Sequence, residues 1–267
     1  MDFVASLSFD PLFWAAALFA ILLAGLSKGG FGAGGSFAGI PLLAVVVGPV
    51  EAAALMLPVL ITMDLVGLRA YWGKWSWSVS WPLMVTCILG VGVGALTFGM
   101  VSDAWLSVLL GVITLSLLAY RYLSAWLIRR LSGGADEAEQ GSRTNWWKAN
   151  CWGTAAGFTS FVIHAGGPPA MLYLTSLKLE KTVYQATTVL FFTWLNAIKL
   201  IPYFALGLFT GSNLAQSAVL LPFAIAAMLL GVWAHNRINQ RLFYAVVYAG
   251  AILAALRLIW DGVNSAL

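Results

Sequence analysis

Two glycine-rich sequences carry the ionisable residues of this chain that are best placed to do chemistry. Lys28 lies in AGLSKGGFGAGG at 24–35, and His164 lies in AGFTSFVIHAGG at 156–167. Both sequences border long apolar runs, where an ionisable group is costly and is retained for a function or by a partner. Lys28 is expected to neutralise an anion or, alternatively, to bond exposed helix-end carbonyls. His164 is expected to donate to a ligand or to carry a proton, unless it only bonds the backbone.

Three more polar residues lie inside apolar runs further along the chain. Asn196 and Lys199 are three residues apart and share one face of a helix, and Asp64 lies in an earlier run. We expect Asp64 to balance the charge of Lys28 or Arg69, or to be a protonatable coupling residue. Lys199 either joins that charge balance or extends its ammonium group to the membrane surface, which the shorter Asn196 cannot do.

Enzyme and metal chemistry find little support in the sequence. The chain contains no GxSxG, HExxH or Walker sequence and no paired acidic motif for metal–diphosphate chemistry. Its two cysteines, Cys87 and Cys151, form no CxxC and no cluster with histidine. We therefore predict no catalytic residue, no metal site and no cofactor.

The composition is typical of a membrane protein. Of 267 residues, 61% are hydrophobic and 9% are charged, whereas soluble domains have about 45–50% apolar and about 25% charged residues. A net charge of +4 in such a chain indicates cytoplasmic loops and not a nucleic-acid partner. We predict an all-α integral membrane protein, a multi-pass helical bundle of the cell inner (plasma) membrane that contacts lipid. A homodimer is compatible with this prediction.

Apolar stretches long enough to enter or span a membrane divide the chain into two halves. They run at 11–27, 36–47, 51–72, 78–99, 104–128, 147–163, 168–177, 182–206, 213–234 and 242–260. The one plainly polar sequence lies between the halves. The pattern predicts a first membrane repeat at 1–128, a cytoplasmic linker at 129–146 and a second membrane repeat at 147–267.

The two halves match each other at a shift of 132 residues. This shift places Gly34 and Gly35 on Gly166 and Gly167, Asp64 on Asn196, and Tyr71 on Tyr203. A register kept without a gap over this distance favours an internal duplication. If each glycine-rich sequence interrupts a helix, as a re-entrant hairpin or as two crossings, the second half is inverted. Most lysines and arginines then face the cytoplasm, and both termini lie outside.

An interrupted helix exposes backbone groups that hydrocarbon cannot satisfy, so it must line a cavity or be buried in protein. We expect half-helices that begin at Ser36 and near Pro168 to point their N-terminal N–H groups inward, which is the geometry of an anion site. The predicted binding residues are Lys28, Gly34, Gly35, Ser36, His164, Gly166, Gly167 and Asn196, with Asp64 and Lys199 for coupling or charge balance. The alternative is that the glycines only permit close helix packing.

The doubled glycine-rich segment resembles the TauE/SafE sulfite exporter family. The resemblance is clearest at LSKGGFGAGGSFAGIPLL, which includes Gly32, Gly34, Gly35 and Pro41. The second copy departs from the pattern, because His164 stands where glycine is usual and two prolines follow the glycine pair. The resemblance implies a permease for sulfite, sulfoacetate or related organosulfur anions.

Together, these observations predict a secondary transporter of a small anion, sulfite or an organosulfonate, with export favoured over import. The anion would bind near the membrane midplane, and the two halves would expose it alternately to each side. Three alternatives stay open: a passive anion channel, a membrane-embedded enzyme that uses His164 or Asp64, and a structural subunit of a larger complex.

Overall fold

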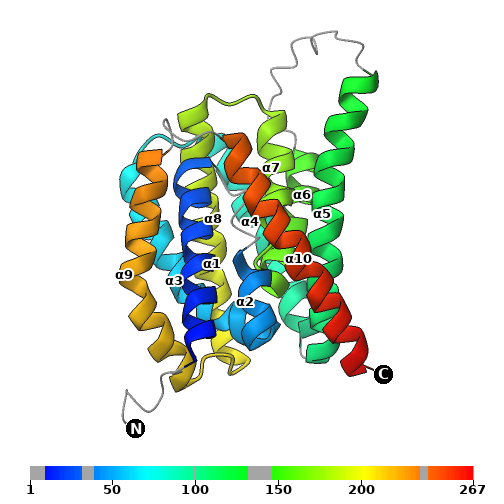
Figure 1. Ribbon diagram of the computed structural model, residues 1–267. Coiled ribbons are helices and arrows are strands. Elements are labelled where there is room, and N and C mark those ends of the chain that lie inside the picture. The colour runs from blue at the N-terminus through cyan, green and yellow to red at the C-terminus, as the bar shows by residue number, and fades with distance from the viewer. Residues whose placement is uncertain (1–9, 32–38, 99, 132–145, 235–239, 267) are drawn as a thin grey trace.

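The computed structural model describes residues 10–31, 39–98, 100–131, 146–234 and 240–266, and these residues form a bundle of helices without strands (Figure 1). In chain order the helices are α1 (Pro11–Leu26), the π-helical turn η2 (Ser27–Phe31), α2 (Gly39–Val47), α3 (Pro49–Ala70), α4 (Trp77–Phe98), α5 (Asp103–Leu131), α6 (Trp146–Ile163), α7 (Gly167–Ser176), α8 (Lys181–Ala205), α9 (Gly211–Ala234) and α10 (Gln240–Ala266). The prediction of an all-α polytopic membrane protein is confirmed.

Local sequence explains where several helices begin. The Asp10 side chain accepts a hydrogen bond from the Leu12 amide at 2.9 Å, and Pro11 occupies the first helical position, where an amide hydrogen would have no partner. Gly48 has a φ of 85°, which glycine adopts without a steric penalty, and it turns the chain between α2 and α3.

Five helices in the described residues are long and apolar enough to cross a membrane. They are Pro11–Gly30, Pro49–Ala70, Trp77–Phe98, Lys181–Ala205 and Gly211–Ala234. A helix of about 20 residues spans the roughly 30 Å of hydrocarbon. The short helices α2 and α7 have 9 and 10 residues and cannot cross alone. Each is the second part of an interrupted segment.

Both halves contain the same order of elements, an interrupted helix followed by three long helices. α1 and α2 correspond to α6 and α7, and α3, α4 and α5 correspond to α8, α9 and α10. Where α3 meets α8, Asp64 lies against Asn196 and Gly67 lies against Val189, so these two helices run antiparallel. This arrangement favours the inverted duplication, which stays a prediction.

Glycines bring the first part of each interrupted helix close to the other half of the molecule. A side chain at Gly25 of α1 would collide with Ala227 of α9, and one at Gly231 of α9 would collide with α1. In the same way, a side chain at Gly157 of α6 would collide with the backbone of Cys87 in α4. Small residues at such crossings let helix backbones approach closely in membranes. Gly25 and Gly157 therefore permit close helix packing, which is the alternative role that the sequence offered for these glycines.

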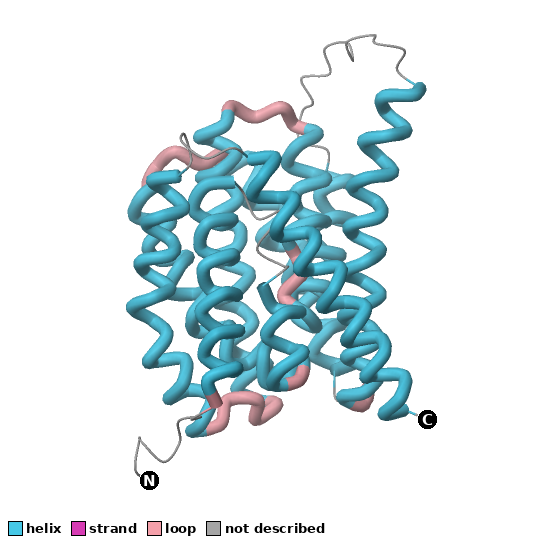
Figure 2. The backbone as a smooth tube through the Cα atoms, in the orientation of Figure 1, coloured by secondary structure: helices cyan, strands magenta, loops and turns pink. Residues whose placement is uncertain are grey.

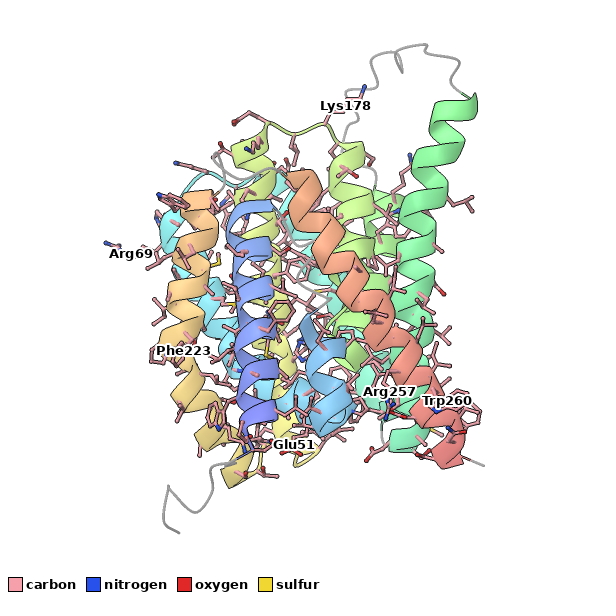
Figure 3. The ribbon with its side chains drawn as sticks, viewed as in Figure 1. Glu51, Arg69, Lys178, Phe223, Arg257 and Trp260 are labelled. Atoms are coloured by element: carbon pink, nitrogen blue, oxygen red, sulfur yellow. The ribbon has the colours of Figure 1, made fainter. Side chains whose placement is uncertain are left out.

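The two ends of the bundle carry different residues. Lys178 and Arg69 lie toward one end, and Glu51, Arg257 and Trp260 lie toward the other (Figure 3). α1 begins and α10 ends at the end that holds Glu51. The linker predicted at 129–146 stays a prediction, because α5 continues through Leu131, α6 begins at Trp146, and residues 132–145 lie outside the described residues.

Candidate functional site

The second interruption, between α6 and α7, lies inside the bundle (Figure 2). His164 follows α6 with a φ of 52°, which is uncommon for a residue other than glycine. The His164 amide donates to the Ser160 carbonyl at 3.0 Å, and the Ala165 amide donates to the Thr159 carbonyl at 3.1 Å. These bonds close the end of α6, and α7 then begins at Gly167. The helix is thus interrupted where the sequence predicts.

The imidazole ring of His164 contacts both α3 and α8. Its Nε2 lies 3.0 Å from the Ala53 carbonyl of α3 and 3.2 Å from the hydroxyl of Tyr203, and its Nδ1 lies 2.8 Å from Nζ of Lys199. A carbonyl can only accept, so Nε2 carries the ring hydrogen and Nδ1 is an acceptor for Lys199. His164 therefore bonds the backbone and also joins a polar cluster.

Lys199 is fully buried at this interruption. Its Nζ lies 3.0 Å from the Ser160 carbonyl, 3.1 Å from the Ser160 hydroxyl and 2.8 Å from His164 Nδ1. These three acceptors match the three hydrogens of an ammonium group, and all three are neutral. Lys199 therefore does not extend to the membrane surface, which was the simpler of the two expectations for it.

The first interruption begins with the π-helical turn η2, after which α2 starts at Gly39. Such turns recur at functional sites. Lys28 lies in this turn, and its Nζ is 2.6 Å from Oδ1 of Asp64 in α3. The other carboxylate oxygen of Asp64 accepts a hydrogen bond from Nδ2 of Asn196 at 2.7 Å. Asp64 thus pairs with Lys28, one of the two partners expected for it.

α8 contacts both interruptions. The Gln185 side chain donates to the Lys28 carbonyl, and the Lys28 ammonium lies 5.7 Å from the centre of the Phe192 ring. Further along α8, Asn196 donates a hydrogen bond to Asp64, and Lys199 lies three residues later, at the second interruption. α8 therefore contributes residues to both clusters, the one at η2 and the one at His164, and we call the two clusters together the buried network.

Two tyrosines bind the interrupted helices in matching ways. The Tyr71 hydroxyl donates to the Gly29 carbonyl at 2.7 Å, and the Tyr203 hydroxyl donates to the Phe161 carbonyl at 3.0 Å. Both donors and both acceptors are related by the 132-residue shift. Each tyrosine therefore connects the end of one long helix to the broken helix of its own half.

Of the two glycine pairs in the predicted site, the structure describes the second pair. Gly34, Gly35 and Ser36 lie outside the described residues. Gly166 and Gly167 are buried at the start of α7, and a side chain at Gly166 would collide with α6. Pro168 and Pro169 have no amide hydrogen, so only two amides remain in this first turn ahead of Ala170. The anion-binding amides expected at α7 are thus reduced to those of Gly166 and Gly167.

The structure adds residues that sequence reasoning did not assign to the site. These are Ser160, Tyr203, Tyr71 and Gln185. The repeat already matched the two tyrosines, and it also pairs Ser160 with Lys28. The repeat was therefore the sequence signal that could have assigned Tyr71, Tyr203 and Ser160 to the site. It could not show which backbone carbonyl each tyrosine hydroxyl bonds.

Two lysines are buried in the described part of the chain, and one of them has a carboxylate partner there. Lys28 is 5% exposed and is paired with Asp64. Among the described residues, no carboxylate oxygen lies within 4.0 Å of Lys199 Nζ, and Lys199 is 0% exposed. A buried ammonium group with only neutral acceptors is costly, and an anion next to it would offset that cost. Lys199 is therefore a candidate counter-charge for an anion.

A cavity of about 550 Å³ lies at the end of the bundle that holds Glu51. Its lining includes the carboxylates of Glu51, Asp103 and Asp261 and the polar side chains of Thr210 and Asn213. This cavity is acidic, in contrast to the lysine-containing network at the interruptions.

The family model described as "Sulfite exporter TauE/SafE" matches residues 17–258, a range that includes both interruptions and the buried network. No curated protein and no solved structure matches the chain.

Proposed function

The chain belongs to the TauE/SafE sulfite exporter family and is a membrane transporter of sulfite or related anions. From this premise we propose that it is a secondary exporter of sulfite or an organosulfonate. The observation that carries the proposal is the buried amino group of Lys199, which, when protonated, has three neutral acceptors and, within the described residues, no carboxylate partner. A small oxyanion would supply the missing negative charge.

The proposed anion site lies between the interruptions. Lys199 would be the counter-charge, His164 and Asn196 would border the anion, and the amides of Gly166 and Gly167 would donate to its oxygens. From the first interruption we include Lys28, Gly34, Gly35 and Ser36 in the proposed site. Asp64 would balance the charge of Lys28, so that the anion neutralises Lys199 and not Lys28.

Alternating access between two inverted halves is the proposed mechanism. It is supported by the antiparallel run of α3 and α8, and by the interruptions that each half contributes near the centre of the bundle. The network side chains are buried, with Asp64 and Lys199 at 0% and His164 at 7% exposure, as expected for a conformation closed to both sides.

Proteoliposomes provide the test of this function. The purified protein should take up sulfite, sulfoacetate or both in a saturable manner, and internal sulfite should accelerate the uptake of external labelled sulfite. Lys199→Met should reduce this flux at least tenfold, whereas Lys178→Met, which removes a lysine from a surface loop, should leave it unchanged. Uptake of sulfate and thiosulfate, measured in the same way, shows which anion the protein prefers.

Each alternative predicts a different result. A passive channel would show no acceleration by internal anion, and an enzyme would convert the anion without moving it. Full flux in Lys199→Met would remove the ammonium group from the site and contradict the proposal.

A further inference from the structure

We propose that Lys199 and His164 form a proton-binding site, and that one proton moves with each transported anion. The proposal rests on the proposed function, because it assigns the coupling ion to the same buried site. Its starting observation is the 2.8 Å distance between Nζ of Lys199 and Nδ1 of His164. Two nitrogen bases at this separation share one proton between them.

The hydrogen bonds assign the proton to Lys199. His164 Nε2 must carry a hydrogen, because it faces the carbonyl of Ala53, which can only accept. His164 Nδ1 is then a lone pair that accepts from Lys199. When Lys199 loses its proton, the neutral amine keeps two hydrogens, which still serve His164 and Ser160. The site therefore holds its geometry in both protonation states.

Because of the surrounding charges, binding of the anion and protonation of Lys199 favour each other. Among the described residues, the charged and titratable groups near the pair are Lys28 from η2, Asp64 from α3 and Tyr203 from α8, and α6 contributes the neutral Ser160. Lys28 and Asp64 neutralise each other as an ion pair. The ammonium form of Lys199 is thus the uncompensated charge, and it is favourable in this low-dielectric site only while an anion is bound.

The transport cycle follows from this linkage. On one side, the Lys199 amine takes a proton from water as the anion binds, and the loaded protein opens to the other side. There the anion leaves, the ammonium group returns the proton to water, and the empty site reorients with a neutral amine. The anion and the proton therefore travel in the same direction, and the sum of their two electrochemical gradients decides which direction that is.

The test measures protons and anions together. Sulfoacetate is the probe, because it is fully ionised near neutral pH and carries no proton of its own. Its uptake into proteoliposomes containing a pH-sensitive dye, with the membrane potential clamped, should give a ratio of about one proton per sulfoacetate. An anion flux without proton movement would overturn the proton site but not the proposed function, whereas no anion flux would overturn the proposed function itself.

Two variants locate the proton. Lys199→Arg keeps the positive charge but cannot release its proton, so exchange of internal for external sulfoacetate should persist while net proton-coupled uptake is lost. His164→Asn tolerates the positive φ and keeps an acceptor for Lys199, so the ratio should stay near one. The opposite pattern, with the ratio lost in His164→Asn and kept in Lys199→Arg, would contradict the assignment to Lys199. The ratio in the unmodified protein decides the proposal even if either variant fails to fold.

Discussion

Residues 28 and 64 form a charged pair in the first half of the molecule, whereas the matching residues of the second half, Ser160 and Asn196, are neutral. The second half obtains its ammonium group from Lys199, whose nitrogen reaches Ser160 from α8. Position 67, which matches Lys199 in the first half, is a glycine. Each half therefore has one lysine nitrogen at its interruption. In the first half the lysine belongs to the interruption itself, and in the second half it belongs to α8.

This comparison predicts how the first half tolerates the loss of its ion pair. Lys28→Ser leaves Asp64 buried without its counter-charge, which costs about 3–5 kcal/mol. The double variant Lys28→Ser/Asp64→Asn has the neutral residues of the second half and should recover most of that stability. Thermal unfolding of the purified variants in detergent measures the effect.

Sulfite flux in the same variants separates structural from functional roles of Lys28. We expect the double variant to be stable but to transport less than the unmodified protein, because the proposed anion site includes Lys28. A double variant as unstable as Lys28→Ser alone would show that the matching position of the second half is not equivalent.

Sequence reasoning could identify the buried polar residues but not all of their partners. Asp64 had two candidate partners, and the structure selects Lys28. A lysine in an apolar helix is compatible with burial or with extension to the surface, and only the approach of His164 and Ser160 decides for Lys199. Those contacts join α6 to α8, and no local pattern in the sequence encodes such a contact between distant helices.

At the scale of the elements, each helix lies within a few residues of an apolar stretch, because length and hydrophobicity are local properties. The turn η2 was not predicted, since its extra residue in the helical turn leaves no hydrophobic signature. For the half-helices, α7 begins at Gly167, next to the predicted Pro168, and α2 is described from Gly39 onward. The start predicted at Ser36 lies outside the described residues.

The tyrosine bonds to the interruptions suggest how these elements move. Tyr71 follows the C-terminal end of α3, and Tyr203 lies near the C-terminal end of α8. Because α3 and α8 run antiparallel, the two tyrosines lie toward opposite ends of the bundle. We expect each bond to break when the end of the bundle near its tyrosine opens.

Removing one hydroxyl should therefore favour opening at one end. Tyr71→Phe and Tyr203→Phe each remove a hydrogen bond worth about 1 kcal/mol, which corresponds to a shift of roughly 5-fold in the conformational equilibrium. The apparent affinity for sulfite, measured from each side of oriented vesicles, should change in opposite directions in the two variants. Tyr173→Phe is the matched control, because the buried Tyr173 hydroxyl has no hydrogen-bond partner in the described part of the chain. Equal effects of both variants on both sides would contradict the assignment to opposite ends.

For the whole molecule, the orientation in the membrane connects the acidic cavity to the direction of transport. From the positive-inside rule we expect the end that holds Lys178 and Arg69 to lie in the cytoplasm and the end that holds Glu51 to lie outside. The cavity lined by Glu51, Asp103 and Asp261 would then face outward. Asp261 is paired with Arg257, and the carboxylates of Glu51 and Asp103 would repel an anion that has been released, which opposes its return and favours export.

Labelling of single cysteines in intact cells tests this orientation. In a background with Cys87→Ala and Cys151→Ala, Glu51→Cys should react with a membrane-impermeant maleimide added outside, because Glu51 is exposed at the proposed outer end. Lys178→Cys, in an exposed loop at the opposite end, should react only after the cells are opened. The reverse pattern would place the acidic cavity in the cytoplasm. There it would repel anions before they bind, so the charge of the cavity would no longer favour export. The proposed site at Lys199 would not be affected by this result.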